Sequence, residues 1–167
     1  KCLIIYFSKH GENYCVGNVE LGNTARLARM IQKELQCDMI ELQPAKPYPE
    51  GLEEFVDQAI RENEQGARPA FKNKINNLGN YDVIFFGHPV YHYDIPMIMY
   101  TFIETYAKEF EGKTIYPFCT HEGSGSTGTT NNLRKKLNKS KVQNAFSVNG
   151  QYVDSSEQKV LKWLRSL

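Results

Sequence analysis

The order of short apolar runs and longer amphipathic segments is the feature that most restricts how this chain folds. Runs with strand character alternate with segments of helical period, five of each, along the whole sequence. The expected strands are 2–7, 38–42, 81–87, 114–119 and 142–149, and the expected helices are 23–35, 51–64, 96–107, 129–137 and 155–167. This alternation predicts an α/β fold, a three-layer sandwich with a parallel sheet, in which residues 1–167 form a single domain.

The polarity of each run indicates its place in the sheet. Residues 3–7 and 83–86 are apolar at nearly every position, which is typical of central strands covered on both faces. Segments 38–42 and 142–148 include polar residues, which suits sheet edges. Pro117 removes one backbone donor and predicts irregular pairing just before the following loop. Asp154, with Glu157 three residues later, is expected to cap the final helix.

Composition excludes several classes of protein. Twenty Lys and Arg residues against 19 Asp and Glu give a net charge of +1, which argues against a nucleic-acid binder with a broad basic face. No apolar run approaches the ~20 residues of a membrane-spanning helix, so no membrane insertion is expected. The four cysteines form no CxxC pair, which favours reduced, mostly buried thiols in a cytoplasmic protein.

Three loops contain most of the chemically useful side chains. In an open parallel sheet, ligands bind beyond the carboxyl ends of the strands, near the point where strand order reverses. The loops expected there are 8–24, 87–96 and 119–130, and they contain all four histidines. These loops are therefore the candidate site.

The first loop has the outline of a phosphate site. Ser8 ends the first strand, and Gly22, Asn23 and Thr24 begin the first helix. A helix N-terminus offers unpaired N–H groups and partial positive charge, and small hydroxyl residues add donors. An ordinary Asn or Thr cap explains the same residues, and the motif alone favours that simpler interpretation.

The second loop places three rings, Tyr91, His92 and Tyr93, between Pro89 and Pro96. Rings on a stiff exposed turn suit stacking on a planar heteroaromatic ligand. Packing of one or two of them on the adjacent helix is the alternative. The sequence does not decide between the two.

The third loop contains GSGSTG at 123–128, which satisfies the pattern G-x-G-x-x-G. The dinucleotide fingerprint requires the first strand–helix unit and an acidic residue about 20 positions later, and neither condition is met. The glycines are instead expected to bring N–H groups against a ring system. A phosphate-accepting Asp cluster and a P-loop are absent, and the spacing of His10, His88, His92 and His121 does not support a metal site.

Taken together, the loops resemble those of the flavodoxin family, in particular short-chain bacterial members with an insertion in the phosphate loop. The matching segments are YFSKHGENY with GNTARLA, GHPVYHYDIPM and FCTHEGSGSTG, each after the appropriate strand, and the likeness spans essentially the whole chain. The resemblance implies a five-stranded sheet of order 2-1-3-4-5 and one noncovalent FMN. It places the FMN phosphate on Ser8, His10, Asn23 and Thr24, and the isoalloxazine between 89–92 and 120–125. The implied FMN-binding residues are Ser8, His10, Asn13, Gly22, Asn23, Thr24, Pro89, Val90, Tyr91, His92, Thr120, His121, Gly123, Ser124 and Gly125.

Two functions are compatible with this resemblance. The chain is expected to carry low-potential electrons between a reductase and acceptor enzymes. The alternative is an NAD(P)H-dependent FMN oxidoreductase that reduces quinones or similar acceptors. The near-neutral charge weakens the carrier interpretation, because carriers are typically acidic. The short loops favour it, since they leave little material for a second substrate pocket.

Overall fold

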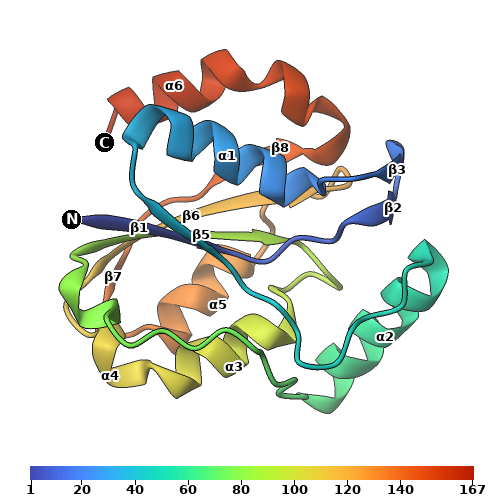
Figure 1. Cartoon of the computed structure of the whole chain (residues 1–167), viewed down its shortest axis with the longest axis horizontal. Coiled ribbons are helices and arrows are strands. Elements are labelled where there is room, and N and C mark those ends of the chain that lie inside the picture. The colour runs from blue at the N-terminus through green and yellow to red at the C-terminus, as the bar shows by residue number, and fades with distance from the viewer.

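A computed structural model describes residues 1–167 and has a parallel central sheet between two layers of helices (Figure 1). The strands are β1 (Cys2–Tyr6), β2 (Gly11–Asn13), β3 (Gly17–Val19), β4 (Asp38–Glu41), β5 (Val83–Pro89), β6 (Thr114–His121), β7 (Lys141–Val142) and β8 (Phe146–Asn149). The α-helices are α1 (Asn23–Leu35), α2 (Leu52–Gln65), α3 (Met97–Thr105), α4 (Ala107–Phe110), α5 (Thr129–Lys136) and α6 (Glu157–Arg165). Two 3₁₀ helices are η1 (Leu78–Asn80) and η2 (Gly150–Ser155). The predicted fold class is confirmed.

The sheet has the order β4-β1-β5-β6-β7, with β8 also paired to β6, and every pairing in it is parallel. In terms of the five expected strands this is the order 2-1-3-4-5. Strand order therefore reverses between β1 and β5, so the loops after these strands flank the crevice in which ligands bind.

The expected strand 142–149 is two short strands. The register pairs Ile115 with Val142 but Phe118 with Phe146, so three residues, 143–145, lie opposite two residues of β6. Pro117 is one of those two and offers no N–H to the edge strand. The irregular pairing predicted from Pro117 thus lies in the middle of β6, which continues to His121, rather than just before the loop.

Each face of the sheet has its own apolar core. On one face, alternate residues such as Ile4 and Phe85 pack with α1 and α6. On the other face, residues such as Ile5 and Phe86 pack with α3 and its neighbours. Helices α1 and α6 lie above the sheet in Figure 1, and α2 to α5 lie below it. No helix is long and apolar enough to cross a membrane.

Some expected helix boundaries were wrong. The helix expected at 96–107 ends at Thr105 and a short helix follows, because Tyr106 leaves helical geometry and its hydroxyl accepts a hydrogen bond from the Ile75 N–H. The final helix starts at Glu157, after η2. Asp154 does not cap it, because the Asp154 carboxylate pairs with Arg26 of α1 instead.

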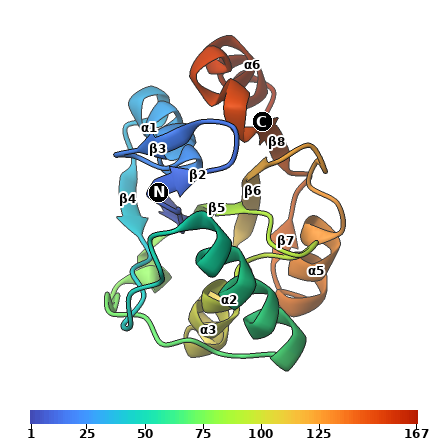
Figure 2. The same ribbon diagram turned by 90° about the vertical axis from the view of Figure 1, so that its right-hand side faces the viewer.

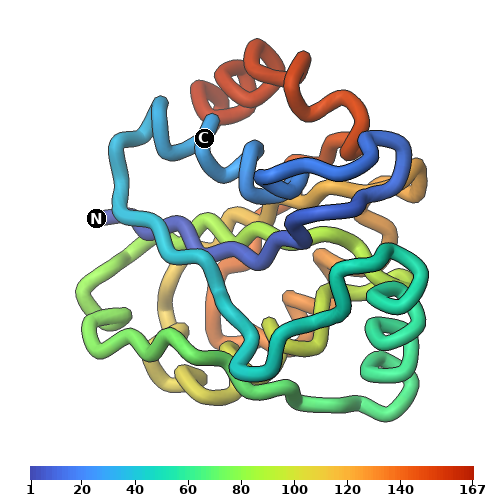
Figure 3. The backbone as a smooth tube through the Cα atoms, turned by 45° about the vertical axis from the view of Figure 1, so that its right-hand side comes forward, coloured from blue at the N-terminus to red at the C-terminus, as the bar shows by residue number.

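Two elements shape the carboxyl edge of the sheet. The insertion in the first loop forms an antiparallel hairpin, β2–β3, that the sequence patterns did not predict. Helix α2 lies beside this edge, across from the hairpin (Figures 2 and 3). Both elements therefore border the region where the three loops meet.

The close approach of β5 to β6 predicts a stability effect at Gly87. A Cβ atom there would lie 2.2 Å from the ring of Phe118, which is fully buried. We expect Gly87→Ala to lower the free energy of unfolding by about 1–3 kcal/mol, because the buried ring has to move. Urea unfolding measures this change.

Gly79→Ala is the matched control, since a Cβ at Gly79 meets no atom within 4 Å. Equal effects of the two substitutions would contradict the steric explanation.

Candidate functional site

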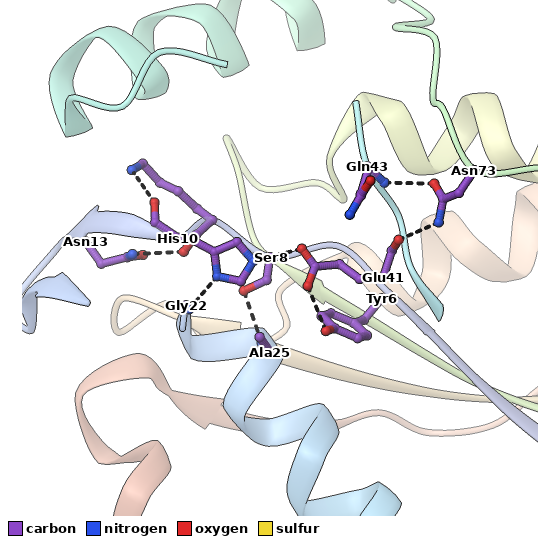
Figure 4. A network of polar contacts seen from close by, with 10 residues as sticks. Tyr6, Ser8, His10, Asn13, Gly22, Ala25, Glu41, Gln43 and Asn73 are labelled. Atoms are coloured by element: carbon purple, nitrogen blue, oxygen red, sulfur yellow. Dashed lines mark hydrogen bonds and ion pairs between the residues drawn. The ribbon is translucent and has the colours of Figure 1, made fainter. Parts of the chain in front are cut away.

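The end of β1 holds the start of α1 through side-chain acceptors. Ser8 Oγ accepts a hydrogen bond from the Ala25 N–H at 3.0 Å, and His10 Nδ1 accepts one from the Gly22 N–H at 2.9 Å (Figure 4). The N–H groups of Asn23 and Thr24 have no acceptor in the chain. Two free donors at a helix N-terminus form an anion-binding site.

The backbone of the first loop lies so close to position 22 that only glycine fits there. A Cβ atom on Gly22 would lie 2.0 Å from the carbonyl oxygen of Lys9 and 2.5 Å from Ser8 Oγ. Any other residue would separate the loop from the helix. Gly22 therefore has a packing role in addition to the phosphate-binding role that the resemblance implies.

His10 lies behind the loop and does not line the cavity described below. Because its Nδ1 accepts from Gly22, its Nε2 carries the proton and donates to Glu41 Oε2 at 2.8 Å. Tyr6 donates to the other oxygen of Glu41 at 2.8 Å. Burial acts to raise the pKa of Glu41, but the hydrogen bonds from His10 and Tyr6 outweigh it and hold that pKa below its ordinary value. His10 thus positions the loop from the side of β4.

A cavity of about 330 Å³ lies at the carboxyl edge, where the three loops meet α2. Its volume is at the lower end of the range for small-molecule sites. The expected residues that line it are Asn13, Asn23, Thr24, Pro89, Val90, Tyr91, His92, Thr120 and His121. The expected residues that do not line it are Ser8, His10, Gly22, Gly123, Ser124 and Gly125.

A buried hydrogen bond joins the first and third loops beside the free amides. Thr24 Oγ1 lies 2.8 Å from Thr120 Oγ1, and both side chains are almost completely inaccessible. A hydroxyl donates one hydrogen bond and accepts two. When Thr120 donates to Thr24, the Thr24 hydroxyl still has a proton to give to a ligand.

The second loop is a tight turn with an unusual backbone. The N–H groups of Tyr91 and Asp94 donate to each other's carbonyl oxygens at 2.9 and 3.0 Å, and His92 and Tyr93 have φ angles of 48° and 65°. Non-glycine residues in this region are strained, and such strain gathers at functional sites. Asp94 supports the turn, because its Oδ1 accepts from the Ile95 N–H, the Tyr100 hydroxyl and the Asn132 amide.

The sequence left open whether the three rings of this loop stack on a ligand or pack on the protein. The structure places the three rings differently. Tyr91 packs on Phe55 of α2 at 5.3 Å between ring centroids and forms part of the cavity wall. His92 also lines the cavity but is exposed. Tyr93 is 71% exposed and lies outside the cavity.

The third loop contributes two titratable side chains to the cavity. His121 Nδ1 accepts from the Gly123 N–H at 3.0 Å, and burial lowers the pKa of His121. Glu122 lines the cavity, and burial raises the pKa of its carboxyl to about 7. Gly123 and Gly125 have φ angles of 113° and 70°, so these glycines shape the turn rather than the cavity wall.

One wall of the cavity is not predicted by the sequence patterns. This wall is one face of α2, made of Leu52, Phe55, Val56, Ala59 and Ile60. Three further lining residues, Lys9, Tyr14 and Glu122, were also not predicted. The signal in the sequence is an apolar stripe wider than the core needs, because only Phe55 and Ala59 of α2 are buried. Lys9 lies just after the first strand and was not predicted as a site residue.

Lys9 connects α2 to the first loop. Its Nζ donates to the carbonyl oxygens of His10 at 3.2 Å and Glu50 at 3.0 Å, and it lies 5.1 Å from the centroid of the Phe55 ring. Burial lowers the pKa of Lys9. Burial thus works against the charged form of this amine, while the nearby Glu12 and Glu50 carboxylates favour it, and the amine lies in the cavity wall.

Comparisons with solved structures give the same fold throughout. A protein described as a flavoprotein from Bacteroides uniformis is 27% identical, with a TM-score of 0.79, and the match covers 99% of this chain and 97% of that one. One from Bacteroides eggerthii is also 27% identical, with a TM-score of 0.74 and coverage of 96% and 98%. A flavoprotein from Lactobacillus acidophilus in complex with FMN is 19% identical, with a TM-score of 0.70 and coverage of 93% and 97%. No curated protein sequence matches the chain.

A family model confirms the resemblance noted in the sequence. The model described as Flavodoxin matches residues 1–167. This match and the flavoprotein neighbours also support FMN as the cofactor. The chain belongs to the flavodoxin family.

Proposed function

We propose that this chain is an FMN-dependent electron-transfer protein that carries electrons between a reductase and acceptor enzymes. The observation that carries the proposal is the pair of free N–H groups at Asn23 and Thr24, beside an apolar-walled cavity. The first feature suits the phosphate of FMN, and the second suits its ring system. When bound, FMN supplies a ring that accepts and donates electrons one or two at a time.

The residues present fit such a group. Asn23 and Thr24 offer backbone donors, and Lys9 adds a positive charge to the same cavity. Pro89, Val90 and Tyr91 line the same cavity with largely apolar groups, which suit one face of a planar ring. The family's phosphate and ring sites therefore have counterparts in this chain, with Ser8, His10 and Gly22 in supporting positions.

The volume of the cavity favours the carrier over the enzyme. About 330 Å³ suits a single planar ligand, whereas an NAD(P)H-dependent enzyme also needs space for a nicotinamide over the flavin. Tyr14 and Val56 line the cavity and are 55% and 39% exposed, so an apolar rim lies open at its mouth. An exposed rim suits brief docking of a redox partner.

One observation favours the alternative, an NAD(P)H-dependent oxidoreductase. Helix α2 supplies the wall material that the short loops lack, so the site has more surface for a second ligand than the loops alone provide. An NADH:FMN oxidoreductase with 13% identity and a TM-score of 0.55 shares the fold, and at this identity the likeness concerns the fold alone. An NAD(P)H-dependent oxidoreductase is therefore the second candidate function.

Electron delivery separates the two candidates. We expect FMN-loaded protein to be reduced slowly by NADH or NADPH alone and rapidly after a catalytic amount of a flavoprotein reductase is added. Stopped-flow absorbance of the flavin measures both rates. Fast direct oxidation of NAD(P)H, further accelerated by a quinone, would reject the carrier and support the enzyme.

The Thr24 hydroxyl is expected to contact the FMN phosphate. We expect Thr24→Ala to lower FMN affinity about 10-fold or more, because a hydrogen bond to a charged group contributes roughly 1.5–3 kcal/mol. Riboflavin, which lacks the phosphate, should lose far less. Flavin-fluorescence titrations give both dissociation constants.

Thr120→Val is the matched control, because it removes the hydrogen bond between the two hydroxyls and leaves the Thr24 hydroxyl in place. It should affect FMN and riboflavin similarly. Equal losses for both ligands in Thr24→Ala would leave Thr24 with a structural role only.

Glu122 should make FMN binding depend on pH. Its carboxyl is neutral below a pKa of about 7 and charged above it, and a charged carboxylate in the cavity repels an anionic ligand. We therefore expect FMN affinity of the wild type, relative to Glu122→Gln, to fall roughly 2- to 5-fold between about pH 6 and about pH 8. The phosphate of FMN titrates equally in both proteins, so the ratio isolates Glu122. A ratio that stays constant with pH would remove Glu122 from the site.

A further inference from the structure

Two cysteines lie side by side at the end of the sheet opposite the cavity. The parallel register of β1 and β4 pairs Leu3 with Asp38, so Cys2 and Cys37, one residue earlier on each segment, face each other. Residues alternate between the two faces of a sheet. Cys2 therefore shares a face with Ile4, and Cys37 with Met39, and all four pack against the core beneath α1 and α6.

The register places the two thiol groups on adjacent strands and on the same face of the sheet. Burial and the neighbouring Cys2 thiol raise the pKa of Cys37. Adjacent parallel strands lie about 4.8 Å apart, within the Cα separation that a disulfide spans. No other pair of cysteines is arranged in this way, because Cys15 lies in the β2–β3 turn and Cys119 is buried in β6.

The local backbone leaves room for the small adjustment that a disulfide requires. Cys37 precedes β4 and follows Gln36, whose φ of 57° ends α1, so it is not fixed by the sheet on its N-terminal side. Both cysteines are partly accessible. Cys37 also lines a surface groove with Arg29 and Lys33, whose positive charges suit an anionic thiol reagent such as glutathione disulfide.

We propose that Cys2 and Cys37 form a reversible thiol–disulfide pair that takes a low-molecular-weight disulfide as its oxidant. The Cys2 thiolate attacks one sulfur of the oxidant, a mixed disulfide forms and one thiol leaves. The Cys37 sulfur then attacks the Cys2 sulfur, its proton goes to the departing second thiol, and the intramolecular bond forms. Two protein thiols are oxidised, and one disulfide is reduced to two thiols.

The bond would join the ends of a segment that carries the phosphate loop and α1. Its closure restricts the unfolded chain over residues 2–37, and the bond lies at the end of the sheet opposite the cavity. The pair thus couples the thiol redox state of the surroundings to the stability of the fold. This inference does not depend on the proposed function.

The test uses FMN-loaded protein with Cys15→Ser, which removes the exposed thiol. After incubation with glutathione disulfide, we expect an intact mass lower by two hydrogen atoms. Trypsin should release residues 2–9 and 34–61 as one linked species that dithiothreitol separates. The apparent Tm should rise by roughly 5 °C or more and return on reduction.

Two further variants serve as controls. Cys2→Ser and Cys37→Ser, each in the same background, should show neither the mass loss nor the oxidant-dependent rise in Tm. A stable mixed disulfide with glutathione on either cysteine of the parent protein, or two thiols that remain free to alkylation, would overturn the proposal. Linkage of Cys119 to either residue would overturn it as well.

Discussion

The contact between the end of β1 and the start of α1 is the constraint on which the site depends. Gly22 brings the helix N-terminus against the Lys9 carbonyl, closer than any side chain permits. Ser8 and His10 then satisfy the donors of Ala25 and Gly22, and the donors of Asn23 and Thr24 stay free. The same contact therefore fixes the helix and leaves its two remaining N–H groups for an anion.

Hydrogen bonds hold the other two loops in place, in addition to the packing of Tyr91 on Phe55. The Thr24–Thr120 contact ties the third loop to the helix, and Asp94 ties the second loop to α3 and α5 through Tyr100 and Asn132. A left-handed turn at His92 persists because these contacts over-determine it. Three loops far apart in the sequence are thus tied to each other and to the helices behind them, which is the preorganisation that a redox cofactor requires.

The sequence predicted what depends on local patterns and strand order, and it missed what depends on contacts between distant segments. Apolar runs such as 83–86 predicted β5, and the carboxyl-edge rule predicted that Thr24, Tyr91 and Thr120 share one cavity. The role of His10 was not predictable, because it depends on Glu41 in a different strand. The split of the last strand likewise depends on register against Pro117, which a single-sequence pattern does not contain.

Helix α2 forms one wall of the cavity, although no sequence motif indicates it. Its N-terminus is held by two contacts from the first loop, Leu52 N–H to Glu12 and Lys9 to the Glu50 carbonyl. Phe55 then packs against Tyr91, so the helix spans the first and second loops. The hairpin therefore anchors this wall through Glu12, and the insertion in the first loop takes part in shaping the cavity.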